Sequence, residues 1–120
     1  MSQYIDGFVI PIATKNITAY RRIASKAGKI WIEHGALDYR ECVGDDLNIK
    51  GFAAFPAMVK TKRGETVVFS WAAFKSRKHR DQVNKRIMKD PRIAAMADEC
   101  GKIFDCKRMI YGGFKTIVGT

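Results

Sequence analysis

The chain of 120 residues is poor in the side chains that build metal centres, disulfide frameworks and membrane spans. It has three cysteines, none of them paired at CxxC spacing, and only two histidines. Three thiols without a paired spacing are typical of reduced cysteines, and two histidines are too few for a zinc or non-haem iron site, so we expect no metal. No stretch approaches the roughly 18 uninterrupted apolar residues of a transmembrane helix, so we expect no membrane association.

Targeting and cofactor signatures are also missing. The N-terminus has no basic segment ahead of an apolar run, which favours a cytoplasmic protein without a signal peptide. Gly112-Gly113 belongs to no phosphate-binding loop, and Ser70 lacks the Gly-x-Ser-x-Gly elbow of many hydrolases. We therefore expect no cofactor. The length favours one domain over residues 1–120.

Acidic residues are few compared with basic ones, 12 against 22, which gives a net charge of +10. Eight of the basic residues lie between positions 75 and 92, where only two aspartates oppose them. Such a run usually forms a solvated helix face, and the alternative is binding of nucleic acid or an acidic partner. Nucleic acid is the less favoured partner because no aromatic residues interleave with the basic ones.

The segment 65–74, ETVVFSWAAF, is the most informative part of the chain. Successive side chains of a strand point to opposite faces of a sheet. One face of this strand carries Val67, Phe69 and Trp71, and the other carries Val68, Ala72 and Phe74. Because both faces are apolar, we expect helices to cover one and a second copy of the chain to cover the other.

Apolar periodicity and turn residues predict the remaining elements. Strands are expected at 4–12, 36–43 and 107–118, and helices at 16–34, 76–89 and from 91 to just before Gly101. We expect the first strand to stop pairing near Pro11, and Gly112-Gly113 to mark a bulge or a close approach to the backbone. The resulting order predicts an α+β fold, a ferredoxin-like βαββαβ antiparallel sheet with helices on one face.

Two carboxylates on the predicted strands are candidate acid, base or ligand-orienting groups. Asp6 lies between Tyr4 and Phe8, and Glu41 between Tyr39 and Val43. Burial of an unpaired carboxylate costs several kcal/mol, so each needs a cation, a donor or a solvated cavity. Arg108, expected on the last strand, is the natural cation. The alternative is a structural salt bridge that fixes the strand order.

His34 lies at the C-terminal end of the first predicted helix, where the helix dipole favours a protonated ring. It is a candidate acid or base, and the alternative is a core histidine with satisfied hydrogen bonds. Nothing in its spacing demands a haem. Trp71 and Tyr111, with Tyr39, are candidates for the floor of an apolar pocket or for packing in the core or a dimer interface.

Several segments together resemble the YbaA-like family of small uncharacterised bacterial proteins. They are Tyr4-Ile-Asp-Gly-Phe-Val9, Gly35-Ala-Leu-Asp-Tyr-Arg-Glu-Cys42, Val67-Val-Phe-Ser-Trp71, Arg80-Asp81 with Asn84 and Met88, Asp90-Pro-Arg92 and Lys107-Arg-Met-Ile-Tyr-Gly-Gly-Phe114. The resemblance implies a dimeric ferredoxin-like α/β barrel. It implies no established activity, since this architecture serves small monooxygenases, haem-degrading proteins, chlorite dismutase-like enzymes and plain ligand binders.

These observations lead to one main hypothesis and two alternatives. The main hypothesis is a homodimer, formed through the sheet face, that binds or transforms a small organic molecule between the sheet and the helices. If it is an enzyme, acid/base chemistry without a cofactor fits best, with His34, Glu41 and Asp6 as catalytic candidates. The ligand would contact Trp71, Arg108 and Tyr111. The alternatives are nucleic-acid or acidic-partner binding through residues 75–92 and a purely structural or regulatory dimer.

Overall fold

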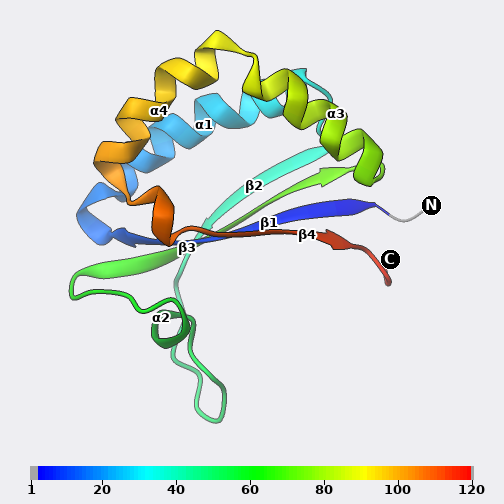
Figure 1. Cartoon of the computed structure of the whole chain (residues 1–120). Helices are drawn as coiled ribbons and strands as arrows, with labels where there is room; N and C mark the ends of the chain where they lie inside the picture. Colours follow the sequence, from blue (N-terminus) through cyan, green and yellow to red (C-terminus); the bar gives the residue numbers. More distant parts are fainter. Residues whose placement is uncertain (1–2, 120) are drawn as a thin grey trace.

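The computed structural model describes residues 3–119 and has a four-stranded antiparallel sheet with the long helices on one face (Figure 1). The strands lie in the order β2-β3-β1-β4. In chain order the elements are β1 (Tyr4–Ala13), η1 (Thr14–Asn16), α1 (Ile17–Glu33), β2 (Asp38–Val43), α2 (Phe55–Met58), β3 (Glu65–Phe74), α3 (Arg77–Met88), α4 (Pro91–Ile103), η2 (Cys106–Arg108) and β4 (Ile110–Lys115). This architecture confirms the predicted fold class.

The core lies between the sheet and the layer formed by α1, α3 and α4. Alternation along β1 and β3 places every second side chain against these helices, because strand side chains have a period of two. Two groups of buried residues result. One contains Ile10, Ile12, Tyr20, Ala24 and Val68, and the other contains Ala36, Ala72, Phe74, Val83 and Ile87.

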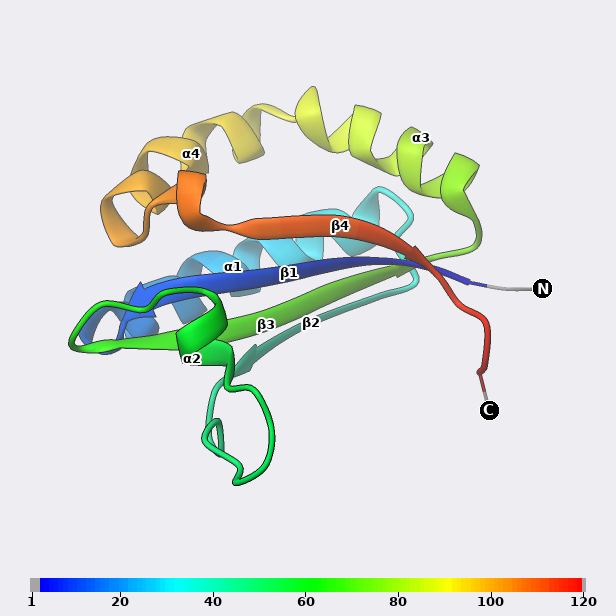
Figure 2. The ribbon, with the colours of Figure 1, turned by 60° about the horizontal axis from the view of Figure 1, so that its bottom comes forward.

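The opposite face of the sheet has no helical layer among the described residues. Figures 1 and 2 show α1, α3 and α4 on one side of the strands, and the segment between β2 and β3 and the end of the chain after β4 on the other. Large apolar side chains on this bare face remain accessible, with Phe69 46%, Ile110 51% and Phe114 62% exposed. The prediction that β3 is apolar on both faces is therefore confirmed.

The helices begin and end where local chemistry favours it. Helix α1 is followed by Gly35 at φ +117°, a left-handed conformation that glycine adopts without strain. Ser76 caps α3 by accepting a hydrogen bond from the His79 amide. Asp90 caps α4 in the same way from the Arg92 amide, with Pro91 at the first helical position.

Four predicted boundaries are wrong. Strand β1 continues through Pro11 to Ala13, since β4 pairs only with Tyr4–Val9 and the proline lies where β1 has a single neighbour. Helix α4 runs past Gly101, and β2 begins two residues later than expected. Strand β4 is short because Asp105 caps a 3-10 turn over Cys106–Arg108.

Gly112 and Gly113 lie in the regular register of β4 and form no bulge. The other reading of the pair, a close approach to the backbone, is confirmed, because a Cβ on Gly113 would overlap the Tyr4 ring. Within residues 3–119, no helix is both long and apolar enough to cross a membrane.

Candidate functional site

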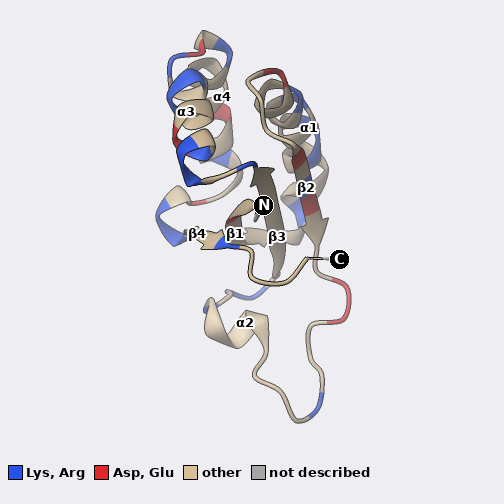
Figure 3. Cartoon of the chain, turned by 90° about the vertical axis from the view of Figure 1, so that its right-hand side faces the viewer, with Lys and Arg blue, Asp and Glu red and all other residues tan. Residues whose placement is uncertain are grey.

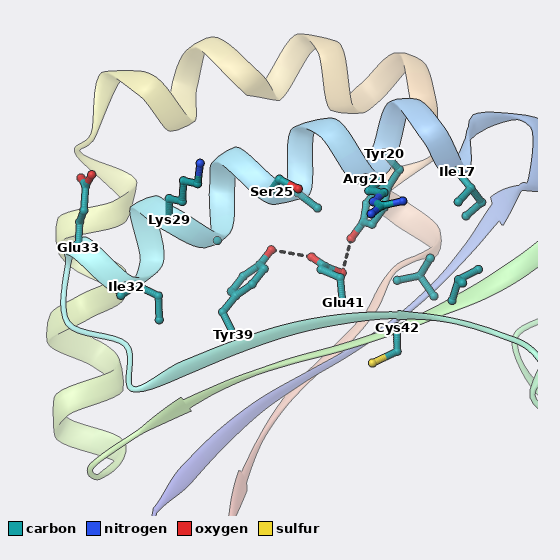
Figure 4. A pocket seen from close by; sticks show the side chains of 14 residues that line it. Ile17, Tyr20, Arg21, Ser25, Lys29, Ile32, Glu33, Tyr39, Glu41 and Cys42 are labelled. Carbon is teal, nitrogen blue, oxygen red and sulfur yellow. Dashed lines mark hydrogen bonds between the residues drawn. The ribbon is translucent and has the colours of Figure 1, made fainter.

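A groove of about 960 Å³ lies between α1 and β2, on the helix side of the sheet. Its volume lies within the range of small-molecule sites, about 300–1,000 Å³. Helix α1 supplies one wall and β2 the other, as Figure 4 shows. The lining is mainly apolar at Ile17, Ala24, Ile32, Val43 and Val68.

The polar centre of the groove is a carboxylate held by two tyrosines. Tyr20 Oη on α1 donates to Glu41 Oε1 at 2.7 Å, and Tyr39 Oη on β2 donates to Glu41 Oε2 at 2.6 Å (Figure 4). Hydrogen bonds to a charged acceptor are shorter and stronger than neutral ones. Glu41 therefore joins α1 to β2 and also places an anion inside the groove.

Both tyrosines keep their protons over the whole ordinary pH range. Burial raises the pKa of Tyr20 and the pKa of Tyr39 far above 10, and the negative charge of Glu41 raises each further. A tyrosine hydroxyl has a single proton, and both of these point at Glu41. The three side chains consequently offer only acceptor lone pairs to a molecule in the groove.

The close contact of α1 with β2 depends on a glycine. Gly28 is buried on α1, and a Cβ at this position would lie 2.8 Å from Tyr39 Cδ1. Any larger side chain would push the Tyr39 ring from its place. Gly28 therefore sets the position of one of the two donors to Glu41.

The rim of the groove is basic. Arg21 and Lys29 line it from exposed positions on α1. Glu33, at the same rim, accepts a hydrogen bond from Arg92 Nη2 at 2.7 Å, and this bond lowers the pKa of Glu33. The groove thus has an anionic centre and a basic entrance.

Asp6 and Tyr111 are brought together in a second cluster away from the groove. Asp6 is 1% exposed, and its Oδ1 accepts a hydrogen bond from Arg80 Nη1 at 2.7 Å. Tyr111 Oη donates to Asp6 Oδ2 at 3.1 Å, and Arg80 also lies over the Tyr4 ring. Arg80 thereby anchors α3 to β1 and β4, since a buried carboxylate needs a close cation.

His34 lies outside the groove, where α1 meets the junction between α3 and α4. Its Nε2 is 2.8 Å from Asp90 Oδ2, and Arg92 also donates to Asp90. These hydrogen bonds, from Arg92 first and then from His34, hold the pKa of Asp90 well below its ordinary value. Arg86 donates to the His34 carbonyl at 3.0 Å, so three elements meet at this residue.

Arg108 and Trp71 occupy two further places. Arg108 lies in η2 and not on a strand, and it forms a bidentate pair with Glu65 at 2.7 and 2.8 Å. The expectation that Arg108 would pair with Asp6 or Glu41 is therefore wrong. Trp71 pairs in register with Arg40 and Gly7, on the bare face of the sheet.

Of the residues proposed from the sequence, Glu41 and the pocket-floor candidate Tyr39 line the groove, whereas Asp6, His34, Trp71, Arg108 and Tyr111 do not. The role of Tyr20 was missed, because apolar periodicity alone marks a tyrosine in α1 as a residue that packs in the core. One signal was available: Gly28 interrupts a regular helix pattern, and such a glycine often marks a close packing contact. Within residues 3–119, no three His, Cys, Asp or Glu side chains lie close enough to hold a metal ion.

Comparison with known proteins gives a consistent family assignment. The chain is 40% identical over 116 residues to the uncharacterised protein YbaA of Escherichia coli K12, covering 97% of each chain, and equally similar to YbaA of Shigella flexneri. A NIPSNAP family protein from Agrobacterium tumefaciens has a TM-score of 0.61 at 16% identity, covering 95% of this chain and 87% of its own. A dimeric ferredoxin-like protein from an uncultured marine organism has a TM-score of 0.56 at 11% identity, with 100% of both chains covered.

The two structural neighbours share the fold, and at these identities the likeness extends no further. The family model for "Protein of unknown function (DUF1428)" matches residues 3–106. This match includes α1, β2 and all three side chains of the Glu41 centre. The chain belongs to the DUF1428 family, and YbaA is its relative.

Proposed function

We propose that the chain binds a small organic molecule in the groove between α1 and β2, with Glu41 as the group that orients it. The observation that carries this proposal is the Glu41 carboxylate, held by Tyr20 and Tyr39 inside a mainly apolar groove of about 960 Å³. A few placed polar groups in an apolar cavity are typical of ligand sites. The bound molecule has an apolar body that packs against the aliphatic walls.

The chemistry of the centre narrows the class of ligand. Because the two phenol protons are already donated to Glu41, the ligand must supply the donor: an ammonium, an amide N–H or a hydroxyl group. A cationic donor gains most, since Glu41 is the one carboxylate at the polar centre. Arg21 and Lys29 at the rim favour a second, anionic group at the other end of the molecule.

A thermal-shift screen tests this proposal with two matched sets of small molecules. One set carries an amine or hydroxyl on an apolar body, and in the other a methyl group replaces the donor. We expect compounds of the first set to raise the melting temperature of the wild-type chain. Glu41→Gln should remove this shift, because an amide has lost the charge and offers its own donors.

Asp38→Asn is the matched control, because Asp38 lies on the same strand with its side chain on the opposite face. This variant should keep the ligand-induced shift. A response that survives in Glu41→Gln, or that does not depend on the donor group, would contradict the proposal. Native mass spectrometry of the purified wild-type chain gives an independent readout by detecting a molecule that co-purifies.

A homodimer formed through the bare sheet face is the second part of the proposal. The accessible Phe69, Ile110 and Phe114 support it, since soluble monomers rarely expose a wide continuous apolar patch. The likeness to a dimeric ferredoxin-like protein supports it as well. Phe69→Asp should convert the dimer to monomers in sedimentation velocity. An unchanged dimer would exclude this face.

A competing function uses the basic surface of α3. Figure 3 shows Lys and Arg concentrated on this helix. The exposed basic residues on α3 and beside its two ends are Lys75, Arg77, Lys78, Lys85 and Lys89. No carboxylate of residues 3–119 pairs with any of them. Such a surface suits a polyanion, and its affinity for DNA should fall steeply with salt. If the chain fails to shift DNA in a gel at low salt, this alternative is excluded.

A further inference from the structure

The segment between β2 and β3, residues 44–64, stands away from the rest of the chain, and we call it the arm. It leaves the sheet on the bare side and carries the single helical turn α2 (Figures 1 and 2). Large apolar side chains are exposed along it: Ile49 54%, Phe52 77%, Phe55 47% and Met58 69%. Exposed apolar groups this numerous mark a surface that a partner covers.

The arm and the bare face form one continuous apolar surface. Phe55 on α2 packs edge-to-face on Phe69 of β3, with ring centroids 6.5 Å apart. This contact fixes the root of the arm to its own sheet. Phe52, whose amide donates to the Ile49 carbonyl in a turn of the arm, remains 77% exposed, so its burial requires another molecule.

The exposed area has the size that a second copy would cover. A folded monomer of 13.6 kDa exposes about 6,600 Å², whereas this chain exposes 8533 Å², roughly 1,900 Å² more. Its radius of gyration of 15.0 Å likewise exceeds the approximately 13.6 Å of a compact chain of this length. Two copies that cover the excess would bury roughly 3,800 Å², which lies within the range of obligate homodimers.

We propose that the arm is a dimerisation element that reaches across to the second copy and buries Phe52 and Met58 against it. This inference rests on the homodimer proposed above and adds the arm to its interface. Two sheets packed face to face lie about 10 Å apart. An arm that projects from the bare face therefore extends into the space that the second copy occupies. A two-fold axis gives each copy the same pair of surfaces, so arm and sheet are buried twice.

Sedimentation of the full chain over a range of micromolar concentrations tests the inference. We expect a wild-type dimer, and we expect Phe52→Asp and Met58→Asp each to raise the dimer dissociation constant at least tenfold. Met88→Asp is the matched control, because Met88 is 79% exposed on α3, in the helical layer. It should change the constant less than twofold. Circular dichroism verifies that each variant is folded.

A photo-crosslinking experiment reads out proximity directly. Benzoylphenylalanine at position 52 should give a covalent dimer on irradiation, and the same group at position 88 should not. Crosslinks from position 52 that stay within one chain would overturn the inference.

The outcomes separate the two proposals. A wild-type monomer would overturn both the homodimer and the arm. A dimer that Phe69→Asp dissociates, but that both arm variants leave intact, would overturn the arm alone. A dimer that none of these substitutions affects uses another surface, and both proposals would then be wrong.

Discussion

Glu41 has two tasks, because the carboxylate that joins α1 to β2 is also the polar centre of the groove. Both tyrosines line the groove, but Tyr20 is buried and Tyr39 is only half-buried. The two hydrogen bonds are similar in length. Loss of the Tyr20 hydroxyl should nevertheless cost more stability, because water replaces a buried donor less well than a half-buried one.

Removal of the two hydroxyls should reveal this coupling. We expect Tyr20→Phe to lower the free energy of unfolding by about 1.5 kcal/mol, and Tyr39→Phe by less. The double variant should cost roughly 0.5 kcal/mol more than the sum, because Glu41 then has neither donor. Urea denaturation of the wild type, the two single variants and the double variant measures this double-mutant cycle. If the two losses of stability were strictly additive, the hydroxyls would not be coupled through Glu41, and the expectation would be wrong.

The ion pair of Glu65 with Arg108 should account for part of the loss of stability in acid. Hydrogen bonds from Arg108 lower the pKa of Glu65 to about 2, although burial acts in the opposite direction. A carboxylate with a lower pKa in the folded state stabilises the fold above its unfolded pKa of about 4.5, and this stability is lost as the pH falls towards 2. We expect Glu65→Gln to be less stable at pH 7 and to show a flatter loss between pH 5 and 2.

Urea denaturation at pH 7, 5, 4 and 3 measures this slope. Glu99→Gln is a suitable control, since the Glu99 side chain is 55% exposed and lies 3.9 Å from Arg22. Exposed pairs contribute little to stability. Equal slopes for wild type and Glu65→Gln would contradict the assignment.

Two glycines inside helices, one packed and one free of contacts, allow a matched comparison of glycine-to-alanine substitutions. Alanine is favoured over glycine inside a helix by up to about 1 kcal/mol. Gly101→Ala on α4 should gain stability, because no atom lies within 4 Å of the added Cβ. Gly28→Ala should lose stability, because its Cβ meets the Tyr39 ring at 2.8 Å. Thermal denaturation measures the melting temperature of each variant. If both substitutions raise it, the packing role of Gly28 is refuted.

The elements with strong local patterns could be predicted from the sequence. Helix α1 has a clear apolar arc and a closing glycine, and β3 has two apolar faces, so both were expected close to their observed positions. The end of β1 was wrong because Pro11 tolerates pairing where β4 is no longer its neighbour, which a linear pattern does not contain. The start of β4 was wrong because Asp105 caps a local 3-10 turn, and α4 simply continues through Gly101, which meets no neighbouring atom.

The candidate site was predictable only in part. A carboxylate among large apolar residues made Glu41 conspicuous, but its partner Tyr20 lies 21 positions away and meets it only after α1 packs on β2. The partner of Asp6 is equally remote, since Arg80 is 74 positions distant. Such long-range hydrogen bonds and ion pairs depend on how the helices cross the sheet, and residue spacing does not encode this.

For the assembled protein, association should make stability depend on concentration. If folding and dimerisation are coupled, mass action raises the melting temperature as the protein concentration rises. We expect this rise for the wild type between 1 and 100 μM, and a constant, lower value for Phe69→Asp. Differential scanning fluorimetry at several concentrations measures both. A wild-type melting temperature independent of concentration would contradict coupled folding and association.

The outer strands of the sheet are shorter than the inner ones. The two inner strands have ten residues each, while the outer strands β2 and β4 have six. Short outer strands, with Asp38 and Arg40 charged on one of them, offer few free amides and carbonyls for lateral growth into fibrils. The margins of the sheet therefore disfavour strand-to-strand polymerisation, so the association proposed for the bare face would end at two copies.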